Sequence, residues 1–309
     1  MIRPFVFPDS AAATRYRAKT SAAYVSTLRE KINIHLETLM PRESRCPVNL
    51  YRAIRYSLLG GGKRVRPLLC VVVSEAAKGR GRAFAQDAGC AIEMVHAASL
   101  ILDDLPCMDD GTTRRGRPTA HVKFGQATAI LASFALLNRA FGVISESAAD
   151  PGVVNQATKV LSGAVGADGM IAGQEIDLNE RAVFGDITTI EELNLLKTGT
   201  LFVAAGHIGA LAAGLEPEAV EAVRRFSRHF GLAFQTADDL IDQMSDAQAA
   251  GKDVRKDFNK PTILSIAGEP AARSSCAEHI QAAFKSLETS GLDTGGFVAL
   301  VDSVFGQAE

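Results

Sequence analysis

The sequence predicts an all-α protein, built as a single large helical bundle. Apolar residues recur at intervals of three and four, alanine and leucine abound while tryptophan is absent, and no alternating strand segments are joined by hairpin turns. Of the 309 residues 47% are hydrophobic, which is ample for a large core. No linker or repeat divides the chain, so we interpret residues 1–309 as one domain, with roughly the first 20 poorly ordered.

The first predicted helices follow from apolar stripes along the N-terminal part of the chain. The first stripe is formed by Val25, Leu28, Ile32, Leu36 and Leu39. The next helix ends at the glycine run 60–62 and carries its apolar side chains at Leu50, Ile54 and Leu58. A later apolar helix ends near Leu105, because Pro106 disfavours its continuation.

Capping signals delimit the later helices. Thr189 and Glu192 have the spacing of a capping box, and Gly214 closes a helix. An acid followed by proline marks two further helix starts, at Asp150–Pro151 and Glu216–Pro217. Two segments that are apolar nearly all round belong in the middle of a large bundle, namely 124–144 and 201–214.

Composition excludes several classes of protein. A net charge of -2 with 22% charged residues gives no support to general nucleic-acid binding. The 5 cysteines lie at irregular spacings without a CxxC pair, which favours reduced thiols in a cytoplasmic protein over a zinc site or disulfide framework. The N-terminus does not resemble a secretory signal, and no uninterrupted apolar stretch predicts an integral membrane segment.

Four carboxylates follow the helix that ends near Leu105: Asp103, Asp104, Asp109 and Asp110. A helix C-terminus already carries partial negative charge, and neighbouring carboxylates repel one another, so a bound cation would relieve this cluster. Carboxylate ligands favour a hard metal, magnesium above all. The alternative is an acidic surface loop, because an isolated acidic run is usually only a solvated face.

A second acidic cluster lies in the segment FQTADDLIDQ and consists of Asp238, Asp239 and Asp242. Asp238 and Asp242 are four residues apart and therefore share a helix face. Two facing helices can hold Mg²⁺ ions between them, with few carboxylates per ion and coordination positions left for substrate phosphates. The paired clusters indicate an enzyme that acts on diphosphate esters.

Basic residues accompany the acids in three sets, in settings bracketed by glycine and proline. Arginine and lysine bind phosphate by charge and by charge-assisted hydrogen bonds. Any single one of them could be a solvated surface charge, but together they favour a phosphate cradle. The sets are Lys63, Arg64 and Arg66; Arg114, Arg115 and Arg117; and Lys197, Lys252 and Lys260. His96, two turns before Asp103, could donate a hydrogen bond to a diphosphate or be a satisfied core histidine.

These motifs, in this order, resemble those of the trans-prenyl diphosphate synthases, or polyprenyl synthetases, and most closely those of bacterial geranylgeranyl diphosphate synthases. The resemblance extends from position 60 to 262 through GGGKRVRP, DDLPCMDDGTTRRGRPTAH, GQEIDL, KTGT, FQTADDLID and GKDVRKDFNKPT. It implies an all-α fold with a central cavity, commonly a homodimer. It also implies Mg²⁺-dependent head-to-tail condensation of isopentenyl diphosphate with an allylic diphosphate, with about three ions when substrate is bound.

The resemblance also implies a role for each matching residue. The metal ligands would be Asp103, Asp104 and Asp109 of the first motif and Asp238 of the second, supported by Asp239 and Asp242. The allylic diphosphate would contact Arg114, Lys197, Thr198, Gln235 and Lys252. The isopentenyl diphosphate would be held by Lys63, Arg66, His96 and Arg115, while Gln174 and Asp177 match a motif of the cavity wall.

Product length is predicted from the helix that leads to the first aspartates. Ala98 lies five residues before Asp103, about 7.5 Å along the helix axis. Family members that stop at fifteen carbons commonly have an aromatic floor there, whereas Ala98 and Ser99 are small, which favours a twenty-carbon product. Val95 or Phe134 could set the length instead.

Other readings remain open at this point. A farnesyl or longer-chain synthase is one, and a class I terpene cyclase is another, although its second metal motif normally differs from DDLID. A non-catalytic partner subunit would be expected to lose aspartates from one motif, and both motifs are intact here. A plain helical scaffold would leave the paired acidic motifs unexplained.

Overall fold

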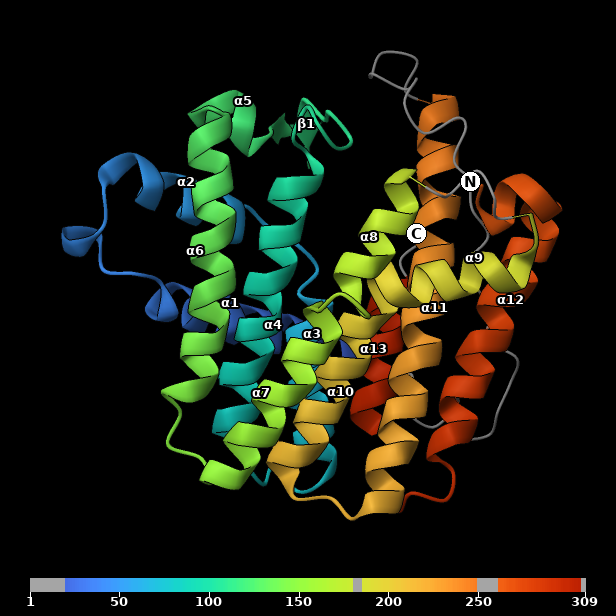
Figure 1. Ribbon diagram of the computed structural model, residues 1–309. Helices are drawn as coiled ribbons and strands as arrows, with labels where there is room; N and C mark the ends of the chain where they lie inside the picture. The colour runs from blue at the N-terminus through green and yellow to red at the C-terminus, as the bar shows by residue number, and fades with distance from the viewer. Residues whose placement is uncertain (1–19, 180–184, 249–260, 307–309) are drawn as a thin grey trace.

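Helices make up nearly all of the regular structure, which confirms the predicted fold class (Figure 1). The computed structural model describes residues 20–179, 185–248 and 261–306, with the backbone alone for 20, 21 and 242–248. The first half contains α1 (Thr20–Leu39), the 3₁₀ turn η1 (Glu43–Arg45), α2 (Val48–Leu58), α3 (Val65–Ala76), α4 (Arg82–Asp103), α5 (Ala120–Phe124), α6 (Gln126–Ser145) and α7 (Pro151–Val165). The second half contains α8 (Met170–Asn179), α9 (Ile187–Asn194), the π-helical turn η3 (Leu195–Gly199), α10 (Thr200–Ala213), α11 (Pro217–Gln248), α12 (Ile263–Leu287) and α13 (Gly295–Phe305).

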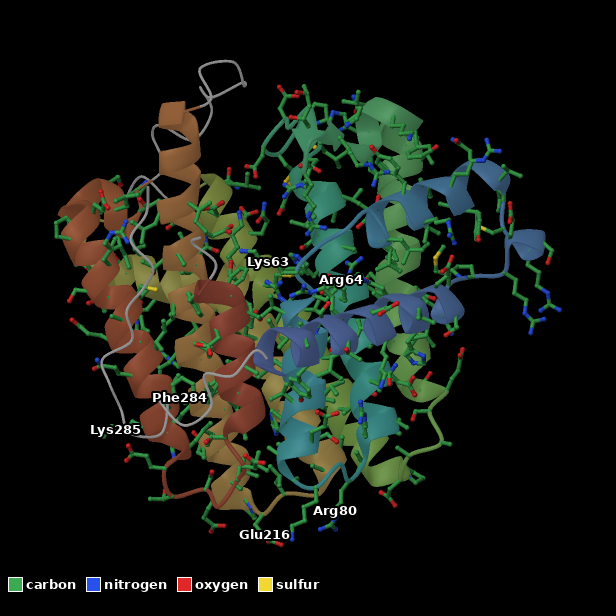
Figure 2. All side chains as sticks on the ribbon, turned by 180° about the vertical axis from the view of Figure 1, so that it is seen from behind. Lys63, Arg64, Arg80, Glu216, Phe284 and Lys285 are labelled. Carbon is green, nitrogen blue, oxygen red and sulfur yellow. The ribbon has the colours of Figure 1, made fainter. Side chains whose placement is uncertain are left out.

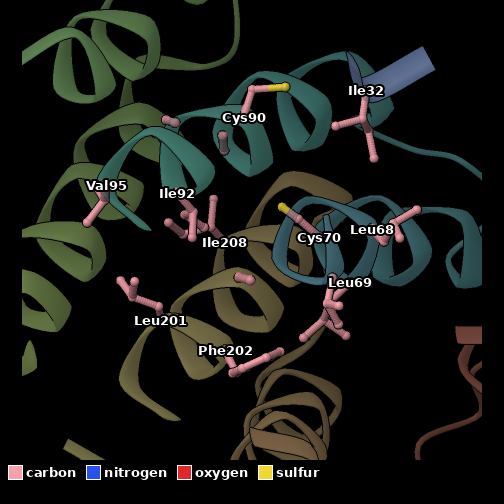
Figure 3. Close-up of a cluster of buried hydrophobic side chains, with 14 of the residues drawn as sticks. Ile32, Leu68, Leu69, Cys70, Cys90, Ile92, Val95, Leu201, Phe202 and Ile208 are labelled. Atoms are coloured by element: carbon pink, nitrogen blue, oxygen red, sulfur yellow. The ribbon is translucent and has the colours of Figure 1, made fainter. Parts of the chain in front are cut away.

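The core lies where α3, α4 and α10 meet beneath α1, as the close-up in Figure 3 shows. Leu68, Ile92 and Phe202 come from the three inner helices and are fully buried, and each such side chain stabilises the fold by about 2 kcal/mol. A Cβ atom on Gly209 of α10 would lie 2.6 Å from the Cys70 carbonyl oxygen of α3. Glycine therefore permits the close approach of these helices, and the prediction that 201–214 is a central helix is confirmed.

Helix α6 differs from the prediction that it is buried on all sides. It packs against α4 and α2 through small residues such as Ala129 and Ala132, both fully buried. On the opposite face Leu131 and Phe134 are 58% and 64% exposed. Because α6 lies at the edge of the bundle, one apolar stripe is left uncovered by the described residues.

The helix ends show which capping predictions are correct. The Asp150 carboxylate accepts a hydrogen bond from the Gly152 amide at 2.8 Å, and Gly214 closes α10 in the left-handed conformation, as predicted. The capping box at Thr189 is wrong. The N-cap lies three residues earlier, at Asp186, whose carboxylate accepts from the Thr189 amide at 2.9 Å.

A small hairpin that the sequence did not predict follows the first acidic cluster. Strands β1 (Thr113–Arg114) and β2 (Arg117–Pro118) pair antiparallel. The two residues between them, Arg115 and Gly116, have φ of 53° and 70°, as a tight hairpin turn requires. The strands were missed because each is only two residues long. The hairpin places arginines near the C-terminus of α4 (Figure 1).

Two described helical stretches are long and apolar enough to span a membrane by length and composition, Gln126–Ser145 and Ile187–Ala213. Core helices of soluble proteins pass the same test. In the bundle, α6 packs against α4, and α10 packs against α3, α4, α7 and α11. We therefore interpret both stretches as bundle helices.

Candidate active site

A cavity of about 1120 Å³ opens between α4 and α11 and is bounded by α3, α8, η3 and the hairpin. Two sequence-predicted residues, Asp104 and Asp239, lie beside it and are engaged with neighbours described below. Asp109 adjoins Asp103, Asp242 lies where only the backbone is described, and Lys252 and Lys260 lie outside the described residues. The predicted residues that line the cavity are Lys63, Arg64, Arg66, His96, Ala98, Ser99, Asp103, Arg114, Arg115, Gln174, Lys197, Thr198, Gln235 and Asp238.

The two acidic motifs meet in this cavity through Asp103, at the end of α4, and Asp238, on α11. The pKa of Asp103 is raised to about 6, mainly by burial; the charge of Lys197 lowers this pKa and that of Asp109 raises it. The backbone amide of Asp109 donates to the Asp103 carbonyl oxygen at 2.8 Å, which folds the acidic loop back onto the helix end. A half-buried carboxylate beside a second acidic residue is a suitable ligand for a cation.

Among the described residues, no three carboxylate, histidine or cysteine side chains converge on one point as a preformed metal site. Asp103 and Asp238 supply hard oxygen ligands from opposite sides, which fits magnesium held partly by substrate phosphates. The assignment of metal ligands therefore stays a prediction, and it is best supported for these two residues.

Asp104 is held differently from Asp103. It is 5% exposed, and Arg114 of the hairpin grips both of its oxygens, with Nε at 2.9 and 3.0 Å and Nη2 at 2.8 Å. Such a bidentate pair is among the stronger charge-assisted interactions. The predicted roles of Asp104 on metal and of Arg114 on diphosphate both require this pair to open, so we expect Asp104 to matter less for metal binding than Asp103.

Lys197 is positioned by the GQEIDL segment of α8. Its Nζ lies 2.5 Å from Oδ2 of Asp177, whose side chain is fully buried. A Cβ atom on Gly173 would lie 2.3 Å from the backbone nitrogen of Lys197, so glycine is required for α8 to approach the π-helical turn η3. Turns of π geometry are frequent at functional sites. Gln174, from the same segment, has a buried Nε2 without a hydrogen-bond partner in the described part of the chain.

A chain of hydrogen bonds connects η3 to the second acidic motif. The Thr198 hydroxyl donates to Oε1 of Gln235 at 2.8 Å, and Nε2 of Gln235 donates to Oδ1 of Asp239 at 2.9 Å. Asp239 thus orients the Gln235 amide at the cavity wall. The metal role that the resemblance implies for Asp239 stays a prediction beside this contact.

A second group of basic residues lines the same cavity. Burial lowers the pKa of Arg66 to about 10, so it stays charged at neutral pH, and its Nε is buried without a partner among the described residues. Burial and nearby arginines, Arg66 and Arg115 first, lower the pKa of His96 well below its usual value. A neutral imidazole still has one N–H to donate. Together with Lys63, these groups could hold a diphosphate.

Arg64 is an exception within the first basic set. Arg64 lines the cavity, but the residue is only 3% exposed and its guanidinium pairs with Glu93 at 2.8 Å, so its charge is already engaged within the protein. Our sequence analysis did not identify Glu93 as a site residue. An acidic residue in an apolar helix, three residues before His96, could have indicated a buried ion pair.

The predicted floor residues line the cavity, and one alternative does not. Ala98 is 4% exposed, and its carbonyl accepts a hydrogen bond from the Ser133 hydroxyl of α6 at 3.0 Å. Ser99 and Val95 also line the cavity. Phe134 points away from it and is 64% exposed, so the suggestion that Phe134 limits product length within its own chain is wrong.

Together the fold and the cavity define an all-α protein in which acidic residues of α4 and α11 share one cavity with several basic residues. The polyprenyl synthetase family model matches residues 47–290, and the chain belongs to this family. It is 42% identical to a geranylgeranyl diphosphate synthase of Pseudescherichia vulneris over 277 residues, covering 89% of this chain and 88% of the relative. It is 40% identical to the geranylgeranyl diphosphate synthase of Pantoea ananas, covering 84% and 85%.

Solved structures agree with this membership. An FPP/GFPP synthase from Zymomonas mobilis superposes with a TM-score of 0.78 at 35% identity, covering 92% of this chain and 97% of that one. A geranyltransferase from Helicobacter pylori, complexed with magnesium and isoprenyl diphosphate, gives a TM-score of 0.81 at 27% identity, covering 93% and 98%.

Proposed function

We propose that this protein is a Mg²⁺-dependent prenyltransferase that condenses isopentenyl diphosphate head to tail with an allylic diphosphate. We further propose that it converts farnesyl diphosphate to the twenty-carbon geranylgeranyl diphosphate. The observation that carries the proposal is one cavity lined by Asp103 and Asp238 together with two sets of basic residues. The names of the relatives at 40% and 42% identity support the choice of product.

The allylic diphosphate would bind beside Asp103 and Asp238. Bound magnesium would supply positive charge to a leaving diphosphate. Lys197, held by Asp177, would add a fixed positive charge that favours departure of the diphosphate. The Thr198 hydroxyl and the Gln235 amide, fixed by their hydrogen bonds, would present oxygen dipoles to an allylic cation.

The isopentenyl diphosphate would be held by four residues that line the cavity, Lys63, Arg66, His96 and Arg115. Its double bond would then face the ionised allylic carbon. The cavity walls also carry apolar side chains, including Leu102, Leu137 and Leu178. These side chains would exclude water, which would otherwise trap the cation as an alcohol. We assign the final proton to the released diphosphate.

Incubation of the purified chain with Mg²⁺, isopentenyl diphosphate and farnesyl diphosphate tests the proposal. We expect geranylgeranyl diphosphate as the main product by chromatography, because Ala98 and Ser99, which line the cavity, are both small. A hydrocarbon formed from geranylgeranyl diphosphate alone would instead indicate a cyclase. Absence of activity until another subunit is added would indicate a partner subunit.

We also propose that the protein is a cytoplasmic homodimer that pairs through α6. Leu131 and Phe134 form an exposed apolar stripe on this helix, and adjacent apolar residues on a surface are typical of interaction sites. A second copy of the same helix would cover the stripe in a two-fold interface. The family resemblance supports this assembly.

Charge placed on the stripe should therefore prevent dimer formation. We expect the double variant Leu131→Asp/Phe134→Asp to sediment as a monomer at micromolar concentration, whereas the wild type sediments as a dimer. Ile266→Asp is the matched control, because Ile266 is 42% exposed but lies on α12. A monomeric wild type, or a double variant that remains dimeric, would rule out this interface.

A further inference from the structure

Arg64 occupies an unusual backbone position at the start of α3. It is the N-cap residue of that helix and has φ 53° and ψ 34°, the left-handed region that residues with a side chain seldom adopt. The two residues at 61 and 62 are glycines with φ of 95° and 141°, which allow the chain to enter this turn. Strained backbone of this kind persists only where the surroundings hold it in place.

The side chain of Arg64 supplies that restraint by joining three helical elements. Its Nε donates to Oδ1 of Asn33 on α1 at 2.9 Å. Its Nη1 donates to Oε1 of Glu93 on α4 at 2.8 Å, and its Nη2 donates to the carbonyl oxygen of Leu58, the last residue of α2, at 2.8 Å. A planar guanidinium can make such divergent bonds at once, whereas lysine cannot reproduce them.

The turn that Arg64 holds carries the residues predicted to bind isopentenyl diphosphate. Lys63 precedes Arg64 and Arg66 follows it by two residues, and both line the cavity. Figure 2 shows Lys63 and Arg64 next to each other near the centre of the molecule. The same turn is tied to the hairpin, because Nη1 of Arg115 donates to the Gly61 carbonyl oxygen. A shift of the turn would therefore displace several predicted contacts together.

Glu93 completes the arrangement from α4. Its side chain is 4% exposed, so its ion pair with the equally buried Arg64 is shielded from solvent. It lies one turn before His96, and its charge favours the protonated forms of Arg66 and Arg115. Loss of one partner of a buried pair leaves an uncompensated charge, whereas replacing both with apolar residues is often tolerated.

We propose that Arg64 and Glu93 are positioning residues for the isopentenyl diphosphate site. Their buried ion pair fixes the left-handed turn 61–64 against α1, α2 and α4, and thereby places Lys63 and Arg66 at the cavity wall. Neither residue binds the diphosphate itself. This inference rests on the proposed function, because it concerns the second substrate of that reaction.

Steady-state kinetics of Arg64→Met test the inference, with each substrate varied in turn. Misplaced binding groups can cost about 10- to 100-fold, so we expect KM for isopentenyl diphosphate to rise by that factor. KM for farnesyl diphosphate should change by less than about threefold, because Lys197 and Asp238 lie on η3 and α11. The matched control is Arg82→Met, which breaks the partly exposed pair of Arg82 with Glu75 and should leave both KM values unchanged.

The double variant Arg64→Met/Glu93→Met separates positioning from stability. We expect its Tm to return close to that of the wild type while KM for isopentenyl diphosphate stays raised, since the Arg64 side chain then no longer holds the turn. The inference is overturned if Arg64→Met leaves that KM unchanged, if both KM values rise equally, or if the double variant restores KM together with Tm. A wild-type chain that does not consume isopentenyl diphosphate would refute the proposed function itself.

Discussion

Asp103→Asn should lower kcat by about 1000-fold, a loss comparable to that from removing a charge-stabilising group in other active sites. The amide keeps the size of the side chain but removes the negative charge that a magnesium ion requires. Asp103 is the member of the first acidic cluster that lines the cavity opposite Asp238. Initial rates at saturating substrates and several Mg²⁺ concentrations would measure the loss.

Two further asparagine variants serve as comparisons for this result. Asp104→Asn should lower kcat less, because Asp104 is paired with Arg114 and is not among the residues that line the cavity with Asp238. Asp150→Asn should have no effect, since Asp150 caps α7 and asparagine caps helices equally well. If Asp103→Asn retained activity within tenfold of the wild type, Asp103 would not be a principal metal ligand.

Ala98→Tyr should change the main product from twenty carbons to fifteen. Ala98 lines the cavity one to two turns from Asp103, and its carbonyl is bonded to Ser133 of the neighbouring helix, so the backbone there has little room to retreat. A phenol ring would consequently fill the space that a longer chain needs. Chromatography of the products formed from isopentenyl diphosphate and a ten-carbon allylic starter would reveal the change.

Ser99→Ala is the control for this prediction, because Ser99 also lines the cavity but the substitution adds no bulk. We expect its product profile to match that of the wild type. An unchanged twenty-carbon profile in Ala98→Tyr would contradict the assignment of Ala98 and move attention to Val95, which lines the same cavity.

Much of the fold could be predicted because it depends on local signals. The stripe from Val25 to Leu36 is buried as its spacing implies, and Gly214 ends a helix because its backbone is left-handed. The exposed face at Phe134 could not be predicted in this way. The spacing of apolar residues predicts a helix and its apolar face. Whether that face is exposed depends on whether another helix, or another subunit, covers it.

The candidate site shows the same division. The motifs predicted that Asp103, Lys197 and Asp238 share one site, and the cavity brings them together. The pairing of Asp104 with Arg114 was not predictable, because it depends on a hairpin with strands of two residues. The pairing of Arg64 with Glu93 is likewise set by tertiary contacts and could not be predicted from the motif.

The most direct test of the central claim is product analysis of the purified chain with Mg²⁺, isopentenyl diphosphate and farnesyl diphosphate. We expect one new carbon–carbon bond per farnesyl group and geranylgeranyl diphosphate as the main product. We also expect the reaction to be lost when the metal is chelated. Consumption of farnesyl diphosphate without incorporation of isopentenyl diphosphate, or no reaction with any allylic starter, would contradict it.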